Sequence, residues 1–327
     1  MRRVAVLFTG GTISMAWDPV AGGNVPSLDG AAILARTPGL DSIADVVPVD
    51  RGLTPASHFT FAYLGAMWRD IEALLDDEAF DGVVVVQGTD TIEETAFAWD
   101  LASGSPKPVV VTGAMRASDE AGYDGPTNLR DAIAVAASPA THDIGVVVTL
   151  AGTVEAGDDV TKMHTRAFDT FRSPNGGSLG TVTDGAVTIT RSRGPRRRVP
   201  IDMAAARVHL VTAGISTDGS LISAAVASGA DGIVVAATGA GNTAPGMLDA
   251  ARAAMDAGIP VALASRCPAG AITTAYAFPG GGATWARAGA IPVGTLCAIK
   301  ARVAMAFGLG AGLGPEALAV LLADPAG

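Results

Sequence analysis

The chain has 327 residues, of which 49% are apolar and 17% are charged, and its formal net charge is −10. This composition is too apolar for a disordered protein, and it can bury a large core. The negative charge argues against a nucleic-acid groove and against binding to an anionic membrane surface. The 2 cysteines are too few for a disulfide framework.

A short apolar segment, Val4–Phe8, predicts the first strand, and Thr9-Gly10-Gly11-Thr12-Ile13 follows it. The paired glycines bring the backbone close to a ligand and point consecutive N–H groups into one concavity. The glycine spacings of dinucleotide and P-loop motifs are missing, so a nucleotide loop is the weaker interpretation. The next segment, Ala16–Pro26, is rich in Gly, Pro, Asn and Asp. We expect it to be a mobile loop beside Thr12, where a lid would act.

The most informative stretch begins at Val83–Val86, whose β-branched residues predict a strand buried on both faces. Gly88 allows a tight turn, and Thr89, Asp90 or Thr91 can cap a predicted helix that runs to about Leu101. A hydroxyl and a carboxylate, Thr89 and Asp90, therefore lie at the carboxyl end of a strand, where open parallel sheets bind ligands. The alternative is that both residues only cap the helix.

Strands and helices alternate through the rest of the first half, which predicts a mainly parallel sheet with right-handed crossovers. The predicted elements are a helix over Asp29–Ala35, a strand over Ala44–Val47, a helix over Phe61–Leu75 capped by Thr60, a strand over Pro108–Thr112, a helix over Pro126–Ala137 and a strand over Ile144–Leu150. Beyond this point the pattern changes. Gly157–Thr165 is polar without a sustained period and contains Lys162, and Thr181–Thr190 is a predicted hairpin.

The segment Arg191–Pro200 contains five arginines with Gly and Pro and is predicted to be an exposed linker. After it we expect strands at Val208–Val211, Gly232–Ala236 and Val261–Ala264, and helices at Leu221–Ser228, Pro245–Ala257, Lys300–Phe307 and Pro315–Leu322. The fold class is therefore α/β, with a larger N-terminal domain and a smaller C-terminal α/β domain that also has a parallel sheet. The predicted division is 1–190 for the first, catalytic domain, 191–206 for the linker and 207–327 for the second domain.

Thr12, Thr89, Asp90 and Lys162 together contain the groups needed for acyl transfer to water. A threonine hydroxyl is a poor nucleophile at neutral pH and needs a positioned base, which a neutral lysine amine can supply. Backbone N–H groups of Gly11 and Thr89 could stabilise an oxyanion. Other nucleophile sets are absent, because the 4 histidines lie in no Ser/His/Asp context and no G-x-S-x-G elbow occurs. HExxH and clustered Cys/His motifs are also absent, so we expect neither a metal nor a cofactor.

Several motifs in chain order resemble the bacterial-type L-asparaginase/glutaminase family. They are Thr9-Gly10-Gly11-Thr12-Ile13, Gly88-Thr89-Asp90-Thr91, Gly113-Ala114-Met115-Arg116, Asp124-Gly125-Pro126-Thr127-Asn128-Leu129, Asp159-Val160-Thr161-Lys162, Gly239-Ala240-Gly241-Asn242 and Ser265-Arg266-Cys267-Pro268-Ala269-Gly270. Each motif is moderately specific, but the ordered set covers almost the whole chain.

The resemblance implies hydrolysis of the asparagine side-chain amide through a covalent acyl-enzyme, with release of ammonia and possible side activity on glutamine. Thr12 would be the nucleophile, and Thr89, Asp90 and Lys162 would form a proton relay. The implied substrate-binding residues are Gly11, Ser57, His58, Gly88, Ala114 and Asn242. Ser57 lies where the family binds the α-carboxylate, Asp90 where it meets the α-amine, and Ala114 where a backbone carbonyl contacts the amide. The family also implies a homodimer or homotetramer, with Asn242 reaching a neighbouring subunit's site.

This sequence departs from the family pattern in three places. The family usually has a tyrosine on the lid, whereas the first tyrosine here is Tyr63. Gln87 replaces a histidine that often precedes the Gly-Thr-Asp turn, and we expect little effect. The segment Ala257–Pro315 contains no acidic residue, although many members carry one there that helps to bind the α-amine.

Two further interpretations follow from these departures. A non-catalytic amino-acid sensor would keep the pocket and lose turnover, as the missing lid tyrosine suggests. The related subunit that acts on glutamine attached to tRNA would need an extra N-terminal domain and a basic surface, and we expect neither here. The apolar start is too short for a signal peptide and no apolar run can cross a bilayer, so we expect a cytoplasmic protein without membrane or nucleic-acid partners.

Overall fold

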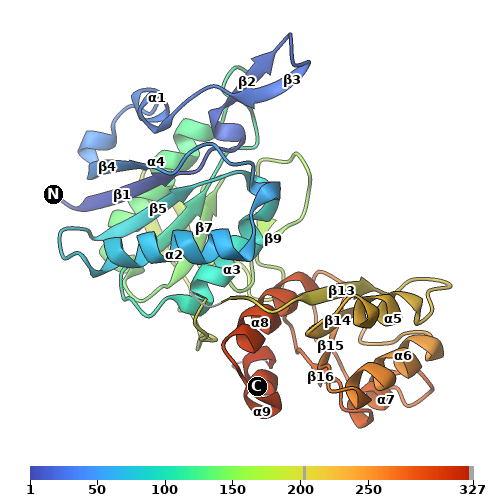
Figure 1. The fold of residues 1–327 in the computed structure, drawn as a ribbon. Helices are drawn as coiled ribbons and strands as arrows, with labels where there is room; N and C mark the ends of the chain where they lie inside the picture. Colours follow the sequence, from blue (N-terminus) through green and yellow to red (C-terminus); the bar gives the residue numbers. More distant parts are fainter. Residues whose placement is uncertain (202–203, 324–327) are drawn as a thin grey trace. The chain divides into compact units, whose positions relative to one another are not determined.

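The computed structural model describes residues 1–201 and 204–323. It divides into two compact units, Met1–Arg193 and Gly194–Gly327, and each has its own sheet. Figure 1 shows the elements of both units in chain order. Within the described residues, no helix combines the length and apolar character that a membrane crossing requires.

The first unit is built on an eight-stranded sheet in the order β12-β11-β8-β7-β6-β5-β1-β4. The strands β4, β1, β5, β6 and β7 are parallel, and β8, β11 and β12 each run antiparallel to the preceding neighbour. The strand bounds are β1 Arg3–Phe8, β4 Asp45–Asp50, β5 Gly82–Val86, β6 Val109–Thr112, β7 Val146–Leu150, β8 Thr153–Ala156, β11 Gly180–Thr183 and β12 Ala186–Ile189. The expected mainly parallel sheet is thus confirmed, with an antiparallel extension at one end.

Helices cover both faces of this sheet. The bounds are α1 Gly30–Ala35, α2 Phe61–Asp76, α3 Ile92–Ala102 and α4 Gly125–Ala137. Val84 and Val86 belong to a buried cluster with Leu129 and Ile133 of α4. Because side chains alternate along a strand, Val83 and Val85 face the opposite side, where α2 and α3 lie in Figure 1.

Local capping agrees with the sequence at the start of α2. The Thr60 side chain accepts a hydrogen bond from the backbone N–H of Tyr63, which gives one of the helix's unpaired donors a partner. The turn before α3 differs from the expectation. Thr89–Thr91 forms a 3-10 turn, and no side-chain cap bond is made at Thr91, the residue that precedes α3. The purely capping interpretation of Thr89 and Asp90 therefore does not describe this junction.

The predicted mobile loop over Ala16–Pro26 is instead an antiparallel hairpin of β2 (Met15–Asp18) and β3 (Gly23–Pro26). The physical reason lies in its turn. One carboxylate oxygen of Asp18 accepts hydrogen bonds from the backbone N–H groups of Val20 and Ala21, and Gly22 has the positive φ of 66° that the turn needs. The polar stretch around Lys162 is also more regular than expected, because β9 (Thr161–Lys162) pairs with β10 (Phe171–Arg172).

The second unit has a parallel four-stranded sheet in the order β13-β14-β15-β16. Its strands are β13 Val208–Thr212, β14 Gly232–Ala237, β15 Val261–Ser265 and β16 Ile291–Pro292, and its helices are α5 Ser220–Ala227, α6 Pro245–Asp256, α7 Gly282–Arg287, α8 Ala298–Gly310 and α9 Pro315–Leu322. The smaller parallel α/β domain is as predicted. The short elements α7 and β16 were not predicted, because α7 has only six residues and begins at the last of three consecutive glycines, and β16 has only two residues, one of them Pro292.

Candidate functional site

Turns from neighbouring parallel strands meet at one edge of the first sheet. Gly11 follows β1, Gly88 follows β5 and Gly113 follows β6, and these strands are adjacent. Gly11 has a φ of 95°, and a Cβ atom on it would lie 2.2 Å from the backbone nitrogen of Gly88. A Cβ on Gly113 would lie 2.5 Å from the backbone oxygen of Gln87. Glycine is therefore required for this close approach, which brings the segments of Thr12, Thr89 and Ala114 together.

Lys162 reaches the β5 turn from β9, which forms a separate two-stranded sheet with β10. Its Nζ donates to Thr89 Oγ1 at 2.9 Å and to Asp90 Oδ1 at 3.3 Å. The Lys162 side chain is 16% exposed, whereas the Asp90 side chain is 67% exposed. Thr89 is buried. An amine in contact with a buried hydroxyl and a solvent-facing carboxylate can move a proton between the interior and the surface of the site.

Thr12 begins a 3-10 turn over Thr12–Ser14 and is partly buried. In the part of the chain that the structure describes, no hydrogen bond joins its side chain to Thr89, Asp90 or Lys162. The link between the segments is the backbone contact of Gly11 with Gly88. The hydroxyl of Ser14 donates to the Gly11 carbonyl oxygen at 2.7 Å and fixes the turn that presents Thr12.

A tyrosine that sequence reasoning missed supports this turn from the loop after β6. The Tyr123 hydroxyl donates to the carbonyl oxygen of Ile13 at 2.7 Å. Burial raises the pKa of Tyr123 to about 12, so the phenol stays protonated and remains a donor at neutral pH. The same loop holds the start of the β2–β3 hairpin, because Ser118 N–H donates to the Met15 carbonyl at 2.7 Å. Tyr123 therefore positions the backbone next to Thr12, although it is not on the hairpin itself.

The loop that carries Ala114 is held by Asp124 and Asn128. The Asp124 carboxylate accepts hydrogen bonds from the backbone N–H groups of Met115 and Arg116. Asn128 Nδ2 donates to that carboxylate at 2.8 Å and to the Gly113 carbonyl oxygen at 3.0 Å. Both residues lie in the Asp124–Leu129 motif, and the motif therefore has a structural task beside Ala114, which is fully buried.

The predicted substrate-binding residues of the β4–α2 connection lie next to the β5 turn. Ser57 and His58 are exposed on a 3-10 turn, Ala56–His58. Thr91 Oγ1 donates to the Ala56 carbonyl oxygen at 3.2 Å. This bond joins the turn of Ser57 to that of Thr89 and leaves the Ser57 side chain at the surface.

Gln87 lies just before the β5 turn in the sequence, is completely buried, and forms side-chain hydrogen bonds with neighbouring residues. Its Nε2 donates to the Gly88 carbonyl and to Thr95 Oγ1, both at 3.3 Å.

Asn242 belongs to the second unit, where its backbone forms a bridge with Thr238. A single chain does not test the predicted role of Asn242 at a neighbouring subunit's site. Among the described residues there is no group of three or more His, Cys, Asp or Glu side chains that could hold a metal ion.

Comparison with known proteins gives a match over both units. A family model described as "Asparaginase, N-terminal" matches residues 3–194, and one described as "Glutaminase/Asparaginase C-terminal domain" matches residues 207–322. The chain is 37% identical to a "Probable L-asparaginase" of Deinococcus radiodurans, and the match covers 96% of this chain and 95% of that protein. It is 32% identical to "L-asparaginase 2" of Escherichia coli over 94% of this chain and 88% of that one.

A solved structure agrees with these sequence matches. The structure of a "Probable Cytoplasmic L-asparaginase" from Campylobacter jejuni superposes with a TM-score of 0.88 at 27% identity. The superposition covers 98% of this chain and 99% of that chain.

Proposed function

The chain belongs to the asparaginase/glutaminase family, and from this premise we propose that it hydrolyses L-asparagine to L-aspartate and ammonia through an acyl-enzyme on Thr12. The contact that carries the proposal is that of Lys162 Nζ with Thr89 Oγ1 at 2.9 Å and Asp90 Oδ1 at 3.3 Å. A single amine there joins two segments that lie 73 residues apart in the sequence. An assembly that only stabilised the fold would not need a lysine to bridge a buried hydroxyl and an exposed acid.

In the proposed reaction the Thr12 oxygen attacks the side-chain amide carbon, and the backbone N–H groups of Gly11 and Thr89 stabilise the oxyanion. The neutral amine of Lys162 accepts a proton through the hydroxyl of Thr89. The proton then goes to the departing nitrogen, which leaves as ammonia. Water hydrolyses the Thr12 ester in the second half of the reaction and releases aspartate.

The proposed contacts of the substrate use the surrounding turns. Asp90 binds the α-amine, and its solvent-facing carboxylate is suited to an ammonium group. Ser57, with His58 beside it, binds the α-carboxylate, Ala114 contacts the amide through its backbone carbonyl, and Gly88 lines the turn. Glutamine is expected as a slower substrate, because one methylene is worth only about 1–3 kcal/mol of discrimination.

The proposed assembly is a homodimer or homotetramer in which Asn242 reaches a neighbouring subunit's site. The buried Asn242 Oδ1 atom has no hydrogen-bond partner among the described residues of this one chain, and a neighbouring subunit could supply it. Light scattering after size-exclusion chromatography measures the assembly. We also expect the protein to act in the cytoplasm, which cell fractionation tests.

Ammonia release from asparagine by the purified protein tests the activity. Substitution of Thr12→Ala and Thr89→Val should each abolish most turnover, and mass spectrometry after a rapid quench should detect an ester on Thr12. Full turnover in either variant would refute the assigned roles. The second candidate function is a non-catalytic amino-acid sensor, which the lack of a tyrosine in Met15–Pro26 favours. A sensor would bind asparagine in calorimetry and release no ammonia.

A further inference from the structure

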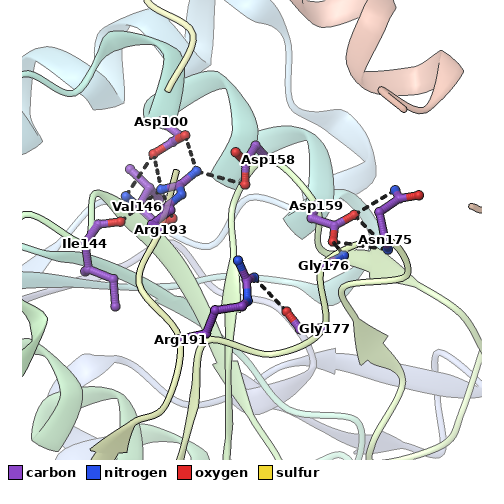
Figure 2. Close-up of polar contacts among 10 residues, drawn as sticks. All are labelled: Asp100, Ile144, Val146, Asp158, Asp159, Asn175, Gly176, Gly177, Arg191 and Arg193. Atoms are coloured by element: carbon purple, nitrogen blue, oxygen red, sulfur yellow. Dashed lines mark hydrogen bonds and ion pairs between the residues drawn. The ribbon is translucent and has the colours of Figure 1, made fainter. Parts of the chain in front are cut away.

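A buried ion cluster lies where the predicted linker begins. The prediction of an exposed segment over Arg191–Pro200 is wrong at Arg193, whose side chain is only 6% exposed. Its Nη1 and Nη2 atoms donate to the two carboxylate oxygens of Asp100 at 2.7 and 2.5 Å. Nη2 also lies 2.9 Å from Asp158 Oδ1. Figure 2 shows the guanidinium between the two acids.

This guanidinium contacts three separate segments of the first unit. Asp100 belongs to α3, Asp158 belongs to the connection between β8 and β9, and Nη1 also donates to the carbonyl oxygen of Ile144 at 2.9 Å. Burial lowers the pKa of Arg193, but the two carboxylates outweigh it and raise the pKa above its usual value. The arginine therefore stays charged, and it neutralises the buried carboxylate of Asp100 and lies beside the partly exposed carboxylate of Asp158.

The segment that leads to Lys162 is held from two sides. Asp158 and Asp159 are adjacent in sequence, but Figure 2 shows them pointing to opposite sides of the chain. Asp159 accepts hydrogen bonds from Asn175 Nδ2 at 2.9 Å and from the Gly176 backbone N–H at 2.6 Å. The backbone at 158–159 is thus fixed between Arg193 and the 175–176 turn.

The cluster connects both halves of the proposed proton relay. The helix α3 begins at Ile92, directly after the 3-10 turn that contains Thr89, and its last full turn carries Asp100. Asp158 lies four residues before Lys162. By binding both acids, Arg193 fixes the distance between the element that carries the hydroxyl and the strand that carries the amine.

We propose that Arg193 is a positioning residue for the reaction, which through Asp158 holds Lys162 at hydrogen-bond distance from Thr89. This proposal rests on the proposed function of Lys162. We call the contacts of Arg193 with Asp100 and Asp158 the clamp. Displacement of a catalytic group by about 1 Å can cost a factor of about 100 in rate, so loss of the clamp should affect the chemical step more than substrate binding.

The substitution that tests the clamp is Asp158→Ala, because it leaves the buried pair of Arg193 with Asp100 in place, so that no buried charge loses its counterion. The matched control is Asp169→Ala, which removes an exposed ion pair with Arg172 of the neighbouring β10. The conservative variant is Asp158→Asn, which keeps an oxygen that can accept from Arg193. Each protein is examined by steady-state ammonia release, thermal unfolding and hydrogen exchange of residues 157–163.

We expect Asp158→Ala to lower kcat by about 10- to 100-fold, with KM within about threefold of the original protein. Exchange of residues 157–163 should become faster, while the melting temperature changes little. Asp158→Asn should recover part of kcat, and Asp169→Ala should behave like the original chain in all three measurements. If the role of Asp158 were purely structural, Asp158→Ala would instead have a lower melting temperature. Its kcat, measured at temperatures well below that melting temperature, would be unchanged.

Unchanged kcat and unchanged exchange in Asp158→Ala would overturn the proposal. If Asp158→Ala does not fold, Arg193→Lys replaces it, because a lysine keeps the charge but cannot bind both acids and the Ile144 carbonyl together. If the original protein releases no ammonia, the proposed function fails. The clamp is then judged by exchange alone, and slow exchange of residues 157–163 that persists in Asp158→Ala refutes it.

Discussion

Substitution of Gly11→Ala tests whether the contact between the β1 and β5 turns organises the site. Two effects add in this variant. Gly11 has a φ of 95° and a ψ of −176°, a backbone region that is essentially restricted to glycine and strains an alanine by about 1–3 kcal/mol. The new Cβ would also lie 2.2 Å from the Gly88 nitrogen and 2.4 Å from its Cα. These are backbone atoms, so no side-chain rotation relieves the overlap, and overpacking of this kind costs about 1–3 kcal/mol.

The control is Gly39→Ala, because Gly39 also has a positive φ, 80°, and nothing lies within 4 Å of the position of its Cβ, although its ψ of 12° puts it in the left-handed region. Gly39→Ala should lose only the left-handed strain of about 1–2 kcal/mol, whereas Gly11→Ala should lose about 2–6 kcal/mol in total. Urea unfolding followed by fluorescence measures both values, and ammonia release measures activity in the folded range. Gly11→Ala should also lose about 100-fold in kcat, because the turns of Thr12 and Thr89 must move apart.

The result that would refute this reasoning is equality of the two variants. If Gly11→Ala unfolds at the same urea concentration as Gly39→Ala and keeps full activity, the close approach of Gly11 and Gly88 has no role in the site.

Three further predictions concern single side chains. Lys162→Met should lower kcat by about 10²- to 10⁴-fold while the protein stays folded. Steady-state kinetics measures kcat and circular dichroism measures folding, and persistent turnover in the folded variant would contradict the prediction. Tyr123→Phe should lower the free energy of unfolding by about 1 kcal/mol, because the Ile13 carbonyl loses its donor, and an unchanged urea midpoint would argue against the bond. Burial raises the pKa of Asp131 from 3.8 to about 6, so its protonated form favours folding, and this contribution is complete below pH 3.8 and is lost as the pH rises through 6. Asp131→Asn should therefore stabilise the protein at pH 8 by on the order of 1–2 kcal/mol, after allowance for solvent screening, and should flatten the pH dependence between 4 and 6, as thermal unfolding over that range can check.

The parallel core was predictable because its strands are short apolar runs between turn residues. Val83–Val86 and Val109–Thr112 show both features, and the cap at Thr60 follows from a local rule. The β2–β3 hairpin was not predicted. Its second strand, β3, carries Gly, Asn and Pro, and its turn depends on a side-chain contact of Asp18 that composition does not reveal.

The site was predictable only in part. Thr12, Thr89 and Asp90 lie on strand-end turns, a position that periodicity can indicate. Lys162 comes from a polar segment without a period, and only the family resemblance singled it out. The burial of Arg193 had no local signal, because its acidic partner Asp100 lies 93 residues earlier in the chain. Contacts of that sequence separation depend on the complete sheet, and a window of neighbouring residues contains no trace of them.

The outer strand β4 has a consequence for how copies of this protein can associate. In the sheet that the structure describes, β4 is the terminal strand beside β1. The backbone N–H of Asp45 donates to the Arg2 carbonyl just before β1, and that of Arg51, just after β4, donates to the Phe8 carbonyl at the end of β1. Because donors alternate in direction along a strand, position 48 would point its donor away from the sheet, and Pro48 has no donor to offer. A strand from another molecule that paired with β4 would therefore lack a hydrogen-bond donor at the middle of this edge strand. This missing donor protects the protein against edge-to-edge aggregation.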